Sequence, residues 1–131
     1  MKSQVSVLQR SEISNPPSHG ARLMSLILND SELFEEWKKD IRTMAERIMF
    51  MRGALHFELC EELKTPGKWE HILKQIGMFS YTGLNEEQSK KLVDSWHIYL
   101  TKNGRISMAG LNSKNVKYVA RCIDVVVRDC N

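Results

Sequence analysis

A long amphipathic stripe in the middle of the chain is the feature that most limits how it can fold. Its apolar residues recur at alternating steps of three and four, namely Phe34, Trp37, Ile41, Met44, Ile48, Met51 and Leu55. This spacing predicts a long helix with one apolar face and charged residues on the other. The stripe fades after Leu59 and Leu63, and Thr65-Pro66-Gly67 ends it.

A helix of about 30 residues is about 45 Å long, which exceeds the width of a small domain. Such a helix either bridges two domains or belongs to a coiled coil. The stripe covers only about three heptads and includes Trp and Met residues, so we favour the bridge. Core packing is the simplest role for its methionines and aromatic residues.

The N-terminal part of the chain gives weaker signals. Residues 1–14 alternate only loosely and predict no clear element. Asn15-Pro16-Pro17 should interrupt any regular element, because each proline removes a backbone N–H donor and biases the preceding residue toward extended backbone. Residues 21–28 form a helix-compatible run. Any of the residues 29–31 (Asn-Asp-Ser) can then cap the long helix.

Shorter elements follow the long helix. Residues 76–82 predict a strand, and Asn85 with Gln88 forms a capping-box pattern for a helix through Trp96. The residues of that pattern lie three apart, so that each side chain can reach the other's backbone N–H.

A hairpin and a last helix complete the pattern. Residues 97–100 predict a strand, Asn103-Gly104 a tight turn with positive φ at both positions, and residues 105–108 the return strand. Ser113 is the predicted cap of the last helix. The inner face of that helix comprises Val116, Val119, Ala120, Ile123, Val126 and Val127. These elements predict an α+β fold, a little sheet covered by helices.

Composition and charge exclude several classes of function. The 131 residues suffice for one modest domain, and the apolar (42%) and charged (27%) fractions are those of an ordinary globular protein. The net charge is +3, and Lys and Arg are interspersed with Asp and Glu. This pattern argues against nucleic acid or an anionic membrane as partner. No apolar run approaches the roughly 20 residues of a membrane helix.

The cysteines and the first residues bear on the compartment. Three cysteines, Cys60, Cys122 and Cys130, form no CxxC pair, which argues against a disulfide framework or zinc knuckle and favours a reducing compartment. The first 17 residues resemble neither a signal peptide nor a transit peptide, so a cytoplasmic location is expected. An organellar parent stays an open alternative, because the true N-terminus is expected to be missing.

No complete catalytic constellation is visible in the sequence. His56 and Cys60 have the i, i+4 spacing of two metal ligands, but no further ligand has matching spacing, so we expect no metal site. Cys60 is better explained as a small buried hydrophobe, and His97 as a hydrogen-bonded core or edge residue. Neither a GxSxG elbow nor a glycine-rich phosphate loop is present.

Two arginines stand out by context. Arg22 follows the Pro-Pro…Gly loop and projects from the start of a helix, and Arg105 follows the hairpin turn on a short strand. Most arginines are solvated surface residues. A guanidinium is also a planar fork for one carboxylate, so two forks at separate places suit a substrate with two carboxylates.

The order of several blocks resembles the aspartate aminotransferases, which are pyridoxal-phosphate-dependent class I aminotransferases. The blocks are Ser14-Asn15-Pro16-Pro17-x-x-Gly20-Ala21-Arg22, Glu32–Trp37, Met44–Ile48, Thr65-Pro66-Gly67-x-Trp69-x-His71-Ile72, Gln75–Asn85, His97-Ile98-Tyr99 and Gly104–Leu111. Together they cover essentially the whole chain from about residue 10. The likeness is to the C-terminal third of those enzymes.

The resemblance implies a fold and a site. It divides the chain into residues 1–29, a remnant of the large cofactor-binding domain, residues 30–64, a long interdomain helix, and residues 65–131, the small C-terminal domain of the fold-type I transferases. It implies that Arg105 binds the substrate α-carboxylate, that Arg22 reaches a neighbouring subunit's site to pair with the distal carboxylate, and that Phe79 lines the site mouth. The enzymes are homodimers.

The chain also departs from the family pattern. The family's Schiff-base lysine and most cofactor contacts lie upstream of Met1, so no catalytic residue can be assigned here, and the isolated chain is predicted not to transaminate or hold pyridoxal 5'-phosphate. Residues 56–63 hold one residue more than the pattern, which turns the helix face by about 100° and predicts a rebuilt helix end.

Two hypotheses for function follow. The first is aspartate transamination in the parent protein, L-aspartate and 2-oxoglutarate giving oxaloacetate and L-glutamate, with this chain recognising the carboxylates of dicarboxylic amino acids and 2-oxo acids. The alternative is a catalytically inactive truncated product that acts at most as an interaction module.

Overall fold

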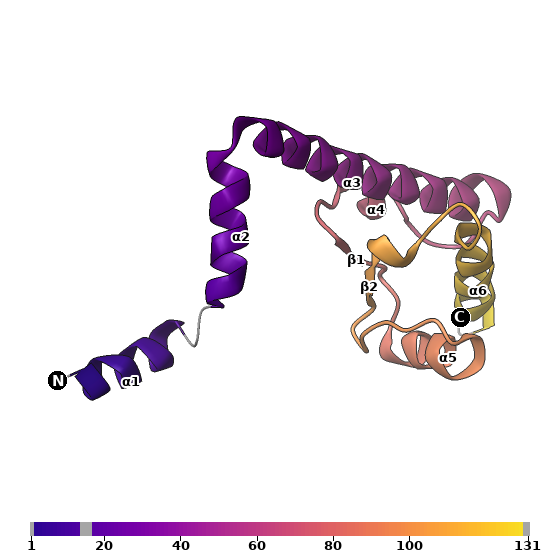
Figure 1. Cartoon of the computed structure of the whole chain (residues 1–131). Helices are drawn as coiled ribbons and strands as arrows, with labels where there is room; N and C mark the ends of the chain where they lie inside the picture. Colours follow the sequence, from indigo (N-terminus) through magenta and orange to yellow (C-terminus); the bar gives the residue numbers. More distant parts are fainter. Residues whose placement is uncertain (1, 14–16, 130–131) are drawn as a thin grey trace. The chain divides into compact units, whose positions relative to one another are not determined.

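The protein consists of helices and one small sheet (Figure 1). The computed structural model describes residues 2–13 and 17–129. The chain divides into two compact units, Met1–Arg42 and Thr43–Asn131. The predicted α+β class is confirmed, and among the described residues no helix is long and apolar enough to cross a membrane. The division into residues 1–29, 30–64 and 65–131 stays a prediction.

Nearly all described residues of the first unit are helical. Helix α1 is Lys2–Ile13, which corrects the expectation of no element in residues 1–14. Its residues are compatible with a helix but form no apolar stripe, and the prediction relied on such a stripe. Helix α2 is Ser18–Asn29, as the run at 21–28 predicted. The predicted stop at Asn15-Pro16 lies outside the described residues.

Helix α3, Ser31–Phe57, is the predicted long helix. Asp30 caps it, since its side-chain Oδ1 accepts hydrogen bonds from the N–H groups of Glu32 (2.9 Å) and Leu33 (3.1 Å). Its buried side chains all lie in the second unit and are Met51, Arg52 and Leu55. The structure therefore buries only the later part of the apolar stripe.

The long helix ends in a π-helical turn, in the segment where the sequence predicts a rebuilt end. Residues Glu58–Glu62 form a π-helix, η1, in which the N–H of Leu63 donates to the Glu58 carbonyl over 2.9 Å. A π-turn contains one residue more than an α-turn. Leu59 thereby stays in the core, fully buried.

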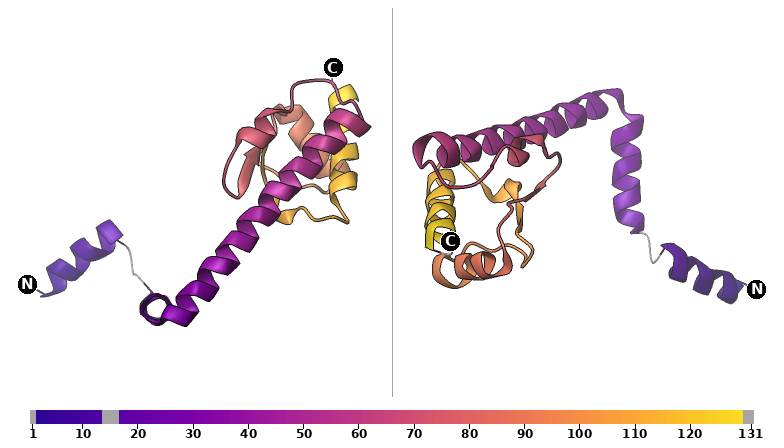
Figure 2. Two further views of the ribbon diagram at one scale, coloured as in Figure 1. Left: turned by 90° about the horizontal axis from the view of Figure 1, so that it is seen from above. Right: turned by 180° about the vertical axis from the view of Figure 1, so that it is seen from behind.

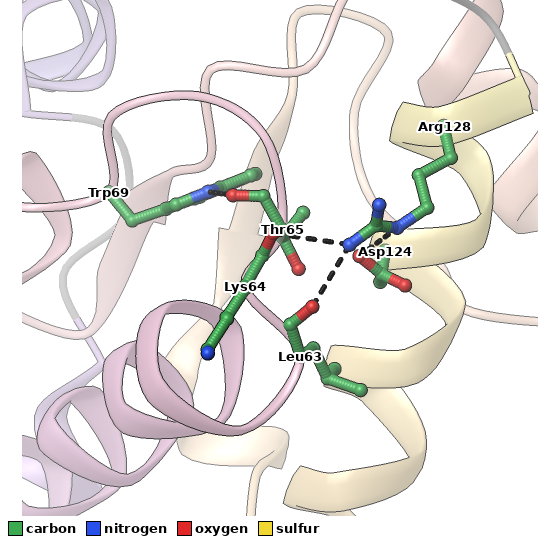
Figure 3. Close-up of polar contacts among 6 residues, drawn as sticks. All are labelled: Leu63, Lys64, Thr65, Trp69, Asp124 and Arg128. Carbon is green, nitrogen blue, oxygen red and sulfur yellow. Dashed lines mark hydrogen bonds and ion pairs between the residues drawn. The ribbon is translucent and has the colours of Figure 1, made fainter.

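An arginine from the last helix closes this end (Figure 3). The Nη2 of Arg128 donates to the carbonyls of Leu63 (2.9 Å) and Lys64 (3.1 Å), and its Nε pairs with Asp124 at 2.8 Å. Lys64 has a positive φ of 50°. Because helix ends leave carbonyls without partners, Arg128 replaces bonds that a longer helix would supply.

The second unit places the sheet between helices (Figures 1 and 2). After α4 (His71–Lys74), strand β1 (Phe79–Tyr81) pairs antiparallel with β2 (Arg105–Ser107). Between them lies α5 (Glu86–Trp96), and after η2 (Met108–Gly110) the last helix is α6 (Val116–Asp129). Helix α6 packs against α5 and η1.

One hydrophobic core holds this unit together. It includes the predicted inner face of α6, with Val116, Val119, Ala120, Ile123, Val126 and Val127 all buried. It also includes Met51, Leu55, Leu59, Trp69, Ile72, Leu84, Leu92, Ile98, Met108, Leu111 and Cys122. The predicted capping box is confirmed, because Asn85 Oδ1 accepts from the Gln88 N–H (2.8 Å) and Gln88 Oε1 from the Asn85 N–H (3.0 Å).

The predicted strand at residues 97–100 is wrong. His97 adopts a left-handed conformation (φ 54°) and ends α5, with the N–H of Ile98 donating to the Leu92 carbonyl over 3.1 Å. Its backbone therefore terminates a helix. His97 is exposed, and its expected core or edge position is wrong. The partner of β2 is β1.

Three local predictions need correction. The strand expected at residues 76–82 is shortened to Phe79–Tyr81, because Gly77 has a left-handed backbone (φ 84°). In the turn, of Asn103 and Gly104 only the glycine has positive φ (79°). The last helix is preceded by a turn in which Asn112, rather than Ser113, accepts from the N–H groups of residues 114 (2.9 Å) and 115 (3.0 Å).

Candidate functional site

The two-stranded sheet presents one exposed face. Backbone hydrogen bonds join residues 82 to 104 and 108 to 78. In the antiparallel register, Phe79 lies opposite Ser107 and Tyr81 opposite Arg105. Alternate residues of a strand share a face, so these four side chains lie together. Ser80, on the opposite face, is buried.

Two of the predicted site residues meet on this face. Arg105 and Phe79 are diagonal neighbours across the strands, a separation that long side chains can bridge. The guanidinium carbon of Arg105 lies 4.7 Å from the centroid of the Phe79 ring. This is the geometry of a cation–π contact, which orients the guanidinium without occupying its N–H donors.

The Arg105 side chain has no carboxylate partner among the described residues. Arg105 is exposed, and Phe79 is 45% exposed. None of the ion pairs between described residues includes Arg105. A planar fork with all five donors available is suited to bidentate binding of a carboxylate.

The backbone of Arg105 is fixed by the preceding turn. Its N–H donates to Thr101 Oγ1 (3.1 Å), and its carbonyl accepts from the Thr101 N–H (3.0 Å). The N–H of Gly104 donates to the Thr101 carbonyl (2.9 Å) and closes the turn. Arg105 thus starts its strand in a defined orientation.

A third arginine, which the sequence did not single out, lies behind the sheet. Arg52 is only 3% exposed. Its Nη1 donates to the Ile72 carbonyl and to Ser80 Oγ, both at 3.1 Å, and its Nη2 to the carbonyls of Gly77 (2.9 Å) and Phe79 (2.7 Å). Burial lowers the pKa of Arg52 from its ordinary value. The only sequence signal for its burial was its position in α3, where this charged residue directly follows the apolar Met51.

The amide of Gln75 was also missed. Its Nε2 donates to the Tyr81 carbonyl (3.1 Å), and its Oε1 accepts from the Tyr81 N–H (2.7 Å) and from Ser80 Oγ (3.0 Å). The side chain thereby pairs with Tyr81 as a neighbouring strand would.

Arg22 lies elsewhere. It is an exposed residue of α2, in the first unit, and forms no ion pair with a carboxylate of the described residues. Arg10, in the last turn of α1, is likewise exposed. The role predicted for Arg22 stays a prediction.

His56 and Cys60 do lie together, with the Cys60 sulfur 3.5 Å from Nε2 of His56. Burial, followed by the charges of Glu70 and Glu61, raises the pKa of the Cys60 thiol. A raised pKa disfavours the thiolate that a nucleophile or metal ligand requires. Within the described residues, no group of three or more His, Cys, Asp or Glu side chains could hold a metal ion. Cys122 is free and buried, and Cys130 lies outside the described residues.

The face around Arg105 lacks one of the groups that pyridoxal phosphate needs, which are a lysine amine for its aldehyde and donors for its phosphate. The strand residues are Phe79, Ser80, Tyr81, Arg105, Ile106 and Ser107, without a lysine. The face therefore fits a carboxylate and does not by itself fit the cofactor.

The chain is similar to known proteins over nearly its whole length. The family model "Aminotransferase class I and II" matches residues 1–123. The chain belongs to that family. It is 50% identical over 127 residues to the cytoplasmic aspartate aminotransferase of Schizosaccharomyces pombe, and 51% identical over 128 residues to the mitochondrial one of Arabidopsis thaliana. These matches cover 97% and 98% of this chain, respectively, and 31% and 30% of those relatives.

The fold is that of the same family. The structure of the aspartate aminotransferase from Saccharomyces cerevisiae cytoplasm matches with a TM-score of 0.89 at 49% identity, over 98% of this chain and 31% of that one. The cytoplasmic aspartate aminotransferase of Giardia lamblia matches with a TM-score of 0.87 at 38% identity, over 97% of this chain and 31% of that one. The chain thus spans about a third of the length of its aminotransferase relatives, and its fold is a part of the aminotransferase fold.

Proposed function

We propose that the protein containing this chain is an aspartate transaminase, which converts L-aspartate and 2-oxoglutarate to oxaloacetate and L-glutamate. The support is the 49–51% identity with proteins of that name from fungi and a plant. Pyridoxal 5'-phosphate, when bound by the rest of the protein, supplies the electron sink for the transfer. The residues of this chain bind and orient the substrate.

Arg105 is the proposed ligand of the substrate α-carboxylate. The observation that carries this proposal is an exposed guanidinium that lies 4.7 Å from the Phe79 ring and has no carboxylate partner among the described residues. The ring supports one face of the guanidinium and leaves its edge, with the N–H donors, for the ligand. Phe79 also supplies an apolar wall beside the bound carboxylate.

Arg22 is the proposed ligand of the distal carboxylate, from a neighbouring subunit of a homodimer. This role is carried over from the family pattern, and its support is the Gly20-Ala21-Arg22 sequence at the start of α2. We likewise propose that residues 1–29 belong to a large cofactor-binding domain, residues 30–64 to an interdomain helix and residues 65–131 to the small domain. A cytoplasmic location is proposed with the fungal relatives as precedent, and microscopy of the tagged full-length protein tests it.

The roles of the arginines can be tested in a chimera in which this chain replaces the matching third of the S. cerevisiae enzyme. Arg105→Ala should lower kcat/KM for every amino-acid substrate, because all carry an α-carboxylate. A buried charge-assisted pair is worth about 2–5 kcal/mol, so falls of about 30-fold to several-thousand-fold are expected. Arg105→Lys should restore little, because an ammonium lacks the planar fork.

Arg22→Ala should lower kcat/KM mainly for aspartate and glutamate, and much less for an aromatic amino acid. Arg10→Ala is the matched control, since Arg10 is an exposed arginine of the neighbouring helix. If Arg22→Ala lowers both classes of substrate equally, or if Arg10→Ala causes the selective loss instead, the distal-carboxylate role of Arg22 is wrong. Undiminished activity of Arg105→Ala would overturn the role of Arg105.

A further inference from the structure

The outer edge of β1 is held by side chains in place of a third strand. Residues 78 and 82 bond to residues 108 and 104, which flank β2, so in the antiparallel alternation the backbone groups of Phe79 and Tyr81 point away from β2. Arg52 donates to the Phe79 carbonyl at 2.7 Å, and Gln75 bonds both backbone groups of Tyr81, at 2.7 and 3.1 Å.

This edge determines where the Phe79 ring lies. A sheet of two three-residue strands is marginal by itself, so its geometry depends on what packs around it. The Arg52 guanidinium bonds the carbonyl of Phe79 itself and that of Gly77, two residues before it. The same group bonds the Ile72 carbonyl in α4, so the start of β1 is fixed to two other segments at once.

The guanidinium of Arg52 is suited to binding several backbone carbonyls at once. Arg52 is 3% exposed and comes from the buried part of α3. Its acceptors among the described residues are all neutral, namely three carbonyls and the Ser80 hydroxyl. A guanidinium presents several donors in one plane and can serve four acceptors. A lysine ammonium presents three donors at a single point and cannot span the same set.

We propose that Arg52 is a positioning residue for the carboxylate site: by binding the backbone of residues 77–80 it sets the place of the Phe79 ring, and through that ring the orientation of Arg105. The proposal rests on the function proposed above for Arg105. Arg52 itself lies behind the sheet and does not contact substrate.

The test uses the same chimera and the substitution Arg52→Lys. A less well oriented Arg105 should weaken substrate binding, so KM for aspartate and for 2-oxoglutarate should rise about 10-fold or more, with kcat changed by less than about 3-fold. A merely structural loss would lower the active fraction, which reduces kcat and leaves KM unchanged. Arg47→Lys is the control, since Arg47 lies on the same helix and makes one bond, to the Leu111 carbonyl at 2.9 Å.

A second, less disruptive substitution tests the proposal if the Arg52→Lys variant does not fold. Ser80→Ala removes one neutral acceptor of Arg52 and should raise KM by about 2- to 3-fold at an unchanged melting temperature. In NMR spectra of the 131-residue chain, Ser80→Ala should also reduce the ring-current shift of the Arg105 side-chain protons over Phe79. Unchanged KM and unchanged ring-current shift overturn the proposal.

The two proposals fail in different ways. If Arg105→Ala raises KM in the chimera while Arg52→Lys and Ser80→Ala do not, only the positioning role of Arg52 is wrong. If Arg105→Ala has no effect, the function proposed for the site is wrong, and the NMR shift still reports whether Arg52 sets the Arg105–Phe79 contact.

Discussion

Gly104 stands directly before Arg105 in a place that no other residue fits. Its φ is +79°, and a Cβ there would lie 2.8 Å from the Leu84 carbonyl oxygen and 3.0 Å from Thr82 Oγ1. Its own carbonyl accepts from the N–H (2.9 Å) and Oγ1 (2.8 Å) of Thr82. The turn before Arg105 is thus closed by both backbone conformation and close contact.

Gly104→Ala should therefore destabilise the chain more than Gly77→Ala. Gly77 also has positive φ (84°), but a Cβ there meets no atom within 4 Å, so its substitution adds only the left-handed strain of about 1–2 kcal/mol. At Gly104 a steric conflict of about 1–3 kcal/mol adds to that strain. Urea unfolding measures both. Equal losses of unfolding free energy would show that the contact with Leu84 relaxes at little cost.

For individual residues, the sequence predicted the two exposed members of the candidate site but missed the two residues whose side chains bond the backbone behind it. Arg105 and Phe79 were found because they belong to recognisable blocks, and their contact follows from the strand register. Arg52 acts through side chain–backbone bonds to residues 20 to 27 positions away, and Gln75 through such bonds to a residue 6 positions away. These bonds could not be predicted from residue spacing, because they depend on the tertiary structure.

Among the elements, the π-helix at Glu58–Glu62 stands where the sequence predicts one additional residue. The Glu58 carbonyl accepts from Leu63, five residues on, and the Leu59 carbonyl from Thr65, six residues on. Leu55 and Leu59, which lie four residues apart on one helix face, are both in the core. The Arg128 guanidinium satisfies the carbonyls of Leu63 and Lys64, which follow the wide turn.

Deletion of Glu61, an exposed residue of this turn, should convert the π-turn to an α-turn with little loss of stability. Removing one residue restores i to i+4 bonding while Leu59 and Leu63 keep their positions. We expect a change in unfolding free energy of about 1 kcal/mol or less, measured with urea. Deletion of Gly53 is the control, because it removes no side chain but turns Met51 and Arg52 by about 100° relative to Leu55. A deletion of Glu61 as damaging as that of Gly53 would contradict this view.

Local signals predicted some elements and misassigned others. The capping box at Asn85 and Gln88 is made within four residues, and the sequence was sufficient for it. Residues 97–100 look like a strand, but His97 takes a left-handed conformation to end α5 and Ile98 is buried beside it. The partner of β2 is 26 residues upstream in β1, and nearby sequence could not indicate it.

For the whole molecule, the periodic stripe predicted which face of α3 is apolar but not which part of it is covered. Met51 and Leu55 are buried, whereas Trp37, Ile41 and Met44 are 42%, 44% and 54% exposed. Periodicity identifies a face, and burial needs a partner surface. The first unit contains no buried side chain among its described residues, so packing energy is concentrated in the second unit.

Hydrogen exchange of the isolated chain should reproduce this contrast. Helices of 12 residues such as α1 and α2 are marginal in water without tertiary packing, and neither has a buried side chain among its described residues. Their amides should exchange with protection factors below about 10, and protection in α3 should rise from Ser31 toward Leu55. The amides of residues 55–59 and 119–127, in helical segments whose inner side chains form the core, should exchange only through global unfolding. Dilution of the sample controls for self-association, which would cover the exposed apolar residues. Strong and equal protection of α1, α2 and α6 at the lowest concentration would show that the first unit is stabilised independently of any partner surface.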